Sequence, residues 1–138
     1  MITLSLLKQM QTDNIGTIDT DMFHLEVALD GNGVPRNGLW IVPRGAPVSR
    51  FNVNIQPIDI YFRHTNKNTS LKKAKQVLDY LQESFEDICE LPSYPPLFTN
   101  TYSNVTITPV AGIEYTGTDE NGKLVFSISG EIRYKESN

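Results

Sequence analysis

The chain has 138 residues, 39% hydrophobic and 20% charged, which is typical of one globular domain with a single core and excludes a largely disordered chain. Its formal net charge of −4, with no basic run longer than Lys72-Lys73, argues against sequence-independent binding to nucleic acid. A lone cysteine, Cys89, excludes an intrachain disulfide and fits a reducing compartment. We therefore expect one domain over residues 1–138.

The first predicted element is a short amphipathic helix over residues 2–12. Its apolar residues recur at helical spacing: Ile2, Leu6, Leu7 and Met10. Polar residues interrupt this segment, and it has neither a basic leader nor a small-residue cleavage site. We therefore expect no signal peptide and no membrane span.

Two strands are predicted next. Residues 23–29 alternate between apolar and other side chains, a pattern typical of a half-buried strand. Residues 30–33, Asp-Gly-Asn-Gly, predict a turn, and the apolar run 39–42 predicts a second strand. Residues 44–50 contain glycine and proline and are expected to form a loop.

The clearest strand region covers residues 51–62, but its apolar residues change parity midway. The first group is Phe51, Val53 and Ile55, and the second is Ile58, Ile60 and Phe62. A shift of one residue turns later side chains to the other face of a sheet, and Pro57 cannot donate a ladder hydrogen bond. We therefore expect a bulge or bend near Pro57.

A longer amphipathic helix is predicted over residues 70–90, capped by Thr69 or Ser70 and stopped by the prolines that follow. Its apolar stripe consists of Leu71, Ala74, Val77, Leu78, Leu81, Phe85 and Ile88. Its charges oppose the helix macrodipole, because lysines gather near the start and carboxylates near the end.

Reversed helix charges favour an interaction with a neighbouring copy, in which a lysine-bearing helix start faces an acidic helix end in a ring. Arginines are also enriched at protein interfaces. For Arg44, Arg50 and Arg63, solvated charges remain the alternative to a contact surface. The predicted interface consists of Lys72, Lys73, Lys75, Glu83, Glu86, Asp87, Arg44 and Arg50.

The C-terminal third is predicted to form two strands joined by a tight turn. The first strand covers residues 105–109, with a possible extension through Ile113 and Tyr115. Residues 119–122 contain Asn-Gly, which favours a type I′ turn. Alternating apolar residues over 124–134 predict a long, half-buried last strand. Together the elements predict an α+β fold, with a mixed or antiparallel sheet of about four to six strands, an N-terminal helix and a central amphipathic helix packed on it.

No catalytic, cofactor or metal site is predicted. Cys89 would lie at an acidic helix end, where negative potential raises a thiol pKa and opposes activation. His24 and His64 lack the spaced partners of a zinc site. Asp30 begins a calcium-loop-like pattern that lacks the closing glutamate. Asp119 is expected to be solvated at a hairpin tip, so we expect a protein without enzymatic activity.

The order of these elements resembles that of phage tail terminator proteins, also catalogued as phage minor capsid proteins. The resemblance rests on the sequence Phe-Asn-Val-Asn-Ile-Gln-Pro-Ile-Asp-Ile-Tyr-Phe-Arg at residues 51–63 and on the helix that follows it. It is strengthened by the opening helix and by the last hairpin, which has a turn over 119–123. The matching residues in these segments are Ala74, Leu78, Leu81, Pro109, Gly112, Phe126 and Ser127. The departures are Pro57 and the turn from Gly31 to Gly38.

The resemblance implies a structural protein that forms a hexameric ring, stops tail-tube polymerisation and joins the tail to the head. The implied partners are further copies of the chain, the tail tube protein and a head-completion or connector protein. Genomic DNA would pass through the ring without specific binding, and no cofactor or membrane is implied. The implied location is the neck of the virion, after assembly in the host bacterial cytoplasm. The alternatives are a connector or minor capsid component at another level of the neck, and a small ligand-binding domain.

Overall fold

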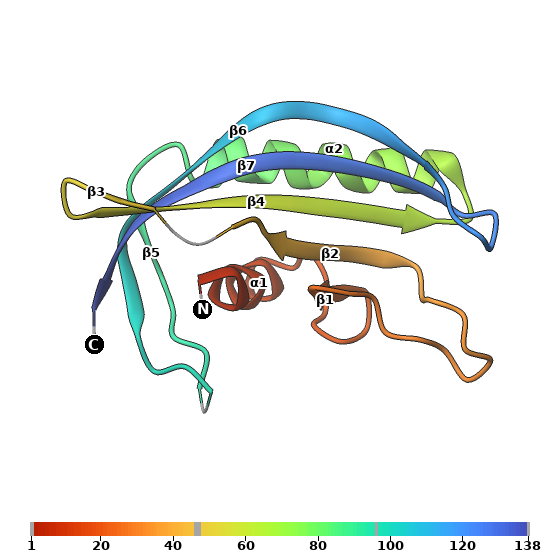
Figure 1. Ribbon diagram of the computed structural model, residues 1–138, viewed down its shortest axis with the longest axis horizontal. Helices are drawn as coiled ribbons and strands as arrows, with labels where there is room; N and C mark the ends of the chain where they lie inside the picture. The colour runs from red at the N-terminus through yellow and green to blue at the C-terminus, as the bar shows by residue number, and fades with distance from the viewer. Residues whose placement is uncertain (1, 46–47, 96, 138) are drawn as a thin grey trace.

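The structure is a computed structural model that describes residues 2–45, 48–95 and 97–137 (Figure 1). This part of the chain contains two helices and seven strands. In chain order they are α1 (Ile2–Thr12), β1 (Met22–His24), β2 (Gly38–Pro43), β3 (Val48–Arg50), β4 (Val53–His64), α2 (Lys67–Ser84), β5 (Cys89–Leu91), β6 (Thr101–Thr118) and β7 (Leu124–Ser137).

The strands form one mixed sheet in the order β1-β2-β4-β7-β6-β5, and β3 pairs with the start of β4. The β1–β2 pair is parallel, and the other pairs are antiparallel. The sheet is long and curved, α2 runs along β4, β6 and β7, and α1 lies by β1, β2 and β5 (Figure 1). The α+β class is confirmed, but the seven described strands exceed the expected four to six.

One hydrophobic core joins both helices to the sheet. Each helix contributes one face, with buried residues three or four positions apart, and the long strands contribute every second residue. The largest fully buried side chains include Leu6, Leu7, Met10, Met22, Leu39, Ile41, Ile58, Ile60, Phe62 and Ile132. None of the helices in the described residues is long and apolar enough to cross a membrane.

The first helix matches its prediction, whereas the predicted ends of the second were wrong. α2 begins at Lys67 because the side chain of Asn66 accepts hydrogen bonds from the next backbone N–H groups and acts as the N-cap. It ends at Ser84 rather than at residue 90. Phe85 is buried, and its carbonyl accepts a hydrogen bond from the Ile107 N–H of β6 at 3.2 Å. The chain then enters the sheet as β5 instead of continuing the helix.

The strand predicted over residues 23–29 was mostly wrong. β1 contains only Met22–His24, because its parallel pairing with β2 stops there. Leu25 leaves the sheet with a left-handed backbone, φ 72°, and is 52% exposed. The turn at residues 30–33 is present, and the Asp30 carboxylate accepts two backbone N–H groups within it. Within the predicted loop 44–50, residues 48–50 form β3, while residues 46 and 47 lie outside the described part.

The predicted bulge near Pro57 was also wrong, because the register between β4 and β7 is unbroken from Asn54 to His64. The parity change arises because Val53 and Ile55 face the other side of a continuous strand. Pro57 is tolerated because its carbonyl accepts the Arg44 N–H at 2.9 Å. Both polar groups of a residue in an antiparallel strand point to the same side. The missing N–H of Pro57 therefore faces the connection between β2 and β3, not β7.

β6 and β7 form a long hairpin that includes the predicted strands and extends beyond them. β6 bends through several register shifts against β7, which curve the sheet over α2 (Figure 1). The turn between them is not the predicted type I′ turn. Gly122 has a positive φ of 74°, but Asn121 is not among the residues with positive φ, and a type I′ turn requires both. The loop is closed instead by hydrogen bonds between Asp119 and Lys123.

Candidate functional site

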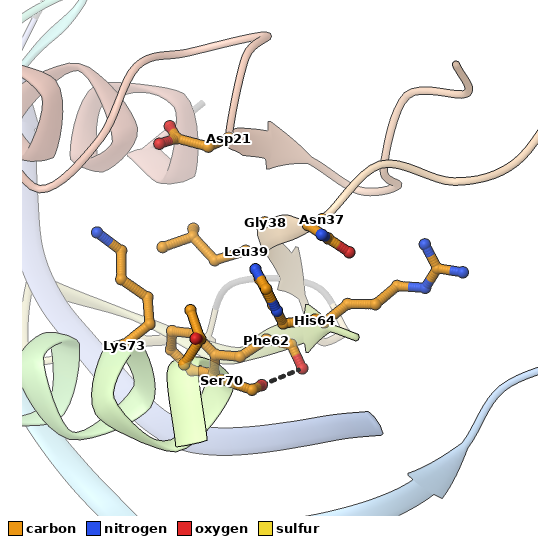
Figure 2. A pocket seen from close by; sticks show the side chains of 10 residues that line it. Asp21, Asn37, Gly38, Leu39, Phe62, His64, Ser70 and Lys73 are labelled. Atoms are coloured by element: carbon orange, nitrogen blue, oxygen red, sulfur yellow. Dashed lines mark hydrogen bonds between the residues drawn. The ribbon is translucent and has the colours of Figure 1, made fainter. Parts of the chain in front are cut away.

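A pocket of about 270 Å³ lies between the start of α2, the start of β2 and the end of β4 (Figure 2). Figure 2 shows Lys73 and Ser70 on α2, His64 and Phe62 on β4, and Asp21 on the segment opposite. The remaining lining residues are Asn37, Gly38, Leu39, Arg63 and Thr69.

Most polar groups of this pocket are already bonded within the chain. The Lys73 ammonium donates to the Ile15 carbonyl, and burial lowers the pKa of this lysine. The Ser70 hydroxyl donates to the Phe62 carbonyl at 3.3 Å. Asp21 accepts from the Thr17 N–H at 2.6 Å, and His64 Nδ1 accepts from the Asn66 N–H at 2.8 Å. These bonds hold α2 against the sheet and against the segment after α1. The polar groups of the pocket therefore stabilise the packing of these elements.

No pattern in the sequence indicates a buried arginine at the end of β4. Arg63 is only 4% exposed, so it is neither a solvated surface charge nor part of a contact surface, the two alternatives that the sequence left open. Its Nε donates to the Asp119 carboxylate, and its Nη1 donates to the Pro35 carbonyl. Lys123 also donates to the Pro35 carbonyl, at 3.1 Å. Arg63 therefore joins β4 to the turn between β6 and β7 and to the loop before β2.

The expectation that Asp119 would be solvated was wrong. Its side chain is 24% exposed in the ion pair with Arg63. Burial alone would raise the pKa of this carboxyl, but bonds from the backbone N–H groups of Lys123 and Asn121 and from Arg63 hold it below its ordinary value. The Asp-x-Asn-x-Lys spacing favours such a capped turn, whereas the contact with Arg63 joins residues 56 positions apart.

Cys89 lies in β5 rather than at a helix end, because α2 stops earlier than predicted. The thiol is half-buried. Burial first, and then the neighbouring Glu90 carboxylate, raise the pKa of the thiol. The expected direction of the shift is therefore confirmed, although its main cause is burial. Within the described residues, no group of three or more His, Cys, Asp or Glu side chains is placed to hold a metal ion.

His24 gives the fold a pH dependence. Burial lowers the pKa of its imidazole below 6.5, and its Nε2 lies 2.7 Å from the Thr3 hydroxyl. Below about pH 6.5 the unfolded chain therefore takes up a proton that the native state still excludes. The free energy of unfolding should fall as pH drops from about 7 towards 5, as measured by urea denaturation at each pH.

The variant His24→Gln should flatten this slope, because no imidazole remains at the buried position. His64→Gln is the matched control, since it makes the same substitution at the other histidine of the chain. An unchanged slope in His24→Gln would show that another group controls the acid response.

Six of the predicted interface residues lie on α2 or directly after it, and the other two, Arg44 and Arg50, lie after β2 and at the end of β3. Lys75 pairs with Asp79 of its own helix at 2.8 Å, and Arg44 pairs with Asp59 at 3.3 Å. Lys73 is committed to the Ile15 carbonyl. The remaining predicted residues are exposed: Lys72, Glu83, Glu86, Asp87 and Arg50.

The macrodipole argument for this interface is weakened by the observed helix ends. Glu86 and Asp87 follow the end of α2, and Lys72 and Lys75 lie beyond its first turn, whereas dipole effects are confined to the terminal turns. In the terminal turns, the charges that oppose the dipole are Lys67 at the start, which is not among the predicted interface residues, and Glu83 near the end.

Apolar side chains are exposed at the two ends of the long axis. The β3–β4 hairpin carries Phe51 at its tip, 92% exposed, and Val48, 57% exposed. The loop after β1 exposes Leu25 and Leu29 near the opposite end (Figure 1). Leu25, Leu29 and Phe51 fall in segments that alternation predicts to be strands, whereas Val48 falls in the predicted loop 44–50. Alternation alone cannot distinguish a buried face from an exposed one.

The exposed leucines border a second pocket, of about 390 Å³, on the sheet side of this loop. It is lined by Leu25, Glu26, Val27, Leu29, Pro35, Trp40, Arg63, Asp119 and Val125. The Trp40 ring is stacked on Tyr61 with 5.2 Å between ring centroids.

Neither a scan of protein-family models nor a search of curated proteins finds a match to this chain.

Proposed function

We propose that the protein is a structural component of a phage tail. In this proposal, copies of the chain form a ring at the head-proximal end of the tail tube, end its polymerisation and join the tail to the head. The proposal assigns no enzymatic activity to the chain and requires no cofactor. Its sequence basis is the resemblance of residues 51–90 and of the last hairpin to phage tail terminator proteins.

The observation that carries the proposal is the presence of different exposed apolar surfaces at the two ends of one elongated domain. The β3–β4 hairpin, whose turn contains Phe51, lies at one end, and the loop after β1, which carries Leu25 and Leu29, extends towards the other (Figure 1). Exposed apolar side chains gathered in this way are typical of protein interfaces. Copies that meet through two unlike surfaces associate head to tail, and such an assembly becomes a ring if its rotation closes.

The proposed partners are other copies of the chain, expected as a hexamer, together with the tail tube protein and a head-completion protein. Exposed charges such as Lys72, Glu83 and Arg50 would lie in or near these contacts, whereas Lys73 is bonded within its own chain. The acidic balance of the chain, −4 per copy, favours a conduit that does not retain DNA.

A tail-length assay tests the proposal. A phage that lacks this gene should make tails of irregular and excessive length that do not join heads, and the wild-type chain supplied in trans should restore uniform tails. Electron microscopy of the particles measures both. Tails of normal length that fail to join heads would assign the protein to another level of the neck. Normal, infectious particles would contradict both assignments.

A further inference from the structure

We propose that Phe51 of one copy inserts into the pocket beside Leu25 and Leu29 of the next copy. This inference rests on the proposed function, because it names the contact through which neighbouring copies would join. Its occupant is a second copy of this chain. The contact is heterologous, since the inserting residue and the receiving pocket belong to different surfaces of the same fold.

The conformation of Phe51 is the first observation. Arg50 and Val53 are paired across the β3–β4 hairpin, so Phe51 and Asn52 form its two-residue turn. Both have left-handed backbones, with φ of 52° and 64°, as a type I′ turn requires. Asn suits this conformation, whereas a bulky aromatic residue does so only with strain. The hairpin thus holds a strained aromatic side chain almost fully in solvent, where Asn or Gly would fold more easily. Residues under such strain gather at functional sites.

The receiving pocket is apolar and firmly built. Apolar side chains of the loop after β1, of β2 and of β7 line most of it, including Leu25, Leu29 and Trp40. Stacking on Tyr61 holds the Trp40 ring in place. The bonds of Arg63 to the Pro35 carbonyl and to Asp119 fix two more walls. A preformed pocket of this kind suits an aromatic anchor, because little order has to be created on binding.

The charges beside Phe51 and beside the two apolar pockets favour the pocket next to Leu25 and Leu29. Arg50 lies next to Phe51 and is exposed, and Glu26 is exposed at the receiving pocket. Neither residue forms an ion pair within the described part of the chain, so they are available to each other. A second apolar pocket is lined by Leu71, Tyr115, Leu124, Phe126 and Lys67. Lys67 would repel Arg50, so this pocket is the poorer match.

The position of the two surfaces decides that the contact joins different copies. The hairpin tip and the loop after β1 lie at opposite ends of the long axis, so one chain cannot fill its own pocket (Figure 1). Each copy would therefore insert its Phe51 into the pocket of one neighbour and accept the Phe51 of another in its own pocket. Repetition of this contact generates either a closed ring or an open filament.

The first test compares the full-length wild-type chain with Phe51→Asn by sedimentation velocity, in solution and with purified tail tubes. Asn suits the left-handed turn, so this variant should be at least as stable to urea as the wild type. Its self-association should nevertheless weaken by about thirtyfold or more, as for loss of a buried aromatic anchor. Ile88→Asn is the matched control. It removes another exposed apolar side chain, 71% exposed, outside both surfaces and should leave association unchanged.

The second test exchanges the charges. Arg50→Glu and Glu26→Arg should each weaken association, and the double variant should restore it, because the ion pair is re-formed in reverse. Wild-type rings that are unaffected by Phe51→Asn would overturn this inference and leave the proposed ring standing. Weakening by both single variants without rescue by the double variant would overturn the pairing of Arg50 with Glu26. A wild-type chain that stays monomeric in solution and on tail tubes would overturn the ring itself.

Discussion

Arg63→Met should lower the free energy of unfolding by about 2–3 kcal/mol. The substitution keeps an unbranched side chain but removes the donors that hold the Asp119 carboxylate and the Pro35 carbonyl. The side chain of Arg63 is 4% exposed, so water cannot easily replace these bonds. The turn between β6 and β7 and the loop before β2 should both loosen. Urea denaturation followed by tryptophan fluorescence measures the change, since Trp40 lies next to this region.

Arg44→Met is the matched control for this prediction. Arg44 also pairs with an aspartate, Asp59, at 3.3 Å, but its side chain is 61% exposed. The loss should be at most about 1 kcal/mol, because the Arg44 guanidinium lies largely in water. The Asp59 carboxylate, whose side chain is 12% exposed, keeps its hydrogen bonds from the Ser129 and Tyr61 hydroxyls when Arg44 is removed. Equal losses in the two variants would show that burial of Arg63 does not determine the strength of its contacts.

Gly38→Ala should lower the free energy of unfolding by about 3 kcal/mol. Gly38 begins β2 with φ of 152°, a conformation that L side chains rarely adopt. An added Cβ would lie 2.5 Å from the Asp21 carbonyl oxygen, which is backbone and cannot rotate away. That carbonyl also accepts the Leu39 N–H at 2.9 Å and so links the segment before β1 to β2. The substitution should therefore disturb the parallel β1–β2 pair.

The same substitution at Gly112 is the control. Gly112 lies within β6, has nothing within 4 Å of an added Cβ and is not among the residues with positive φ. Gly112→Ala should change the free energy of unfolding little, or raise it by about 0.5–1 kcal/mol, because alanine restricts the unfolded chain. Equilibrium urea denaturation of both variants checks the difference. A Gly38→Ala protein as stable as Gly112→Ala would mean that the β1–β2 junction can shift to admit a methyl group.

Local patterns determined where most elements begin or lie. Helical spacing of Ile2, Leu6, Leu7 and Met10 located α1, and alternation located β7. The apolar stripe of α2 was identified through Ala74, Val77 and Leu81, which are buried. These predictions succeed because each element buries one face, and its period in the sequence is set by the backbone geometry of the element itself.

Element ends and the continuity of β4 were decided by contacts between distant segments. The apolar period continues past Ser84 to Ile88, but pairing of β5 with β6 draws residues 89–91 into the sheet. The alternation of residues 23–29 continues past His24, but pairing with β2 ends there because Leu25 turns out of the sheet with a φ of 72°. Pro57 does not interrupt the pairing of β4 with β7, because its missing N–H faces the connection between β2 and β3 instead of β7.

The same distinction between local sequence patterns and contacts of distant segments applies to the individual residues of the candidate sites. The sequence by itself determined an α+β fold with a single core and a thiol with a raised pKa. Only the tertiary structure decided that Arg63 is an internal clamp, that Lys73 is bonded to Ile15, and that Phe51 stands alone in solvent. The physical reason is that periodicity reports which face of an element is apolar. What covers that face depends on segments dozens of residues away.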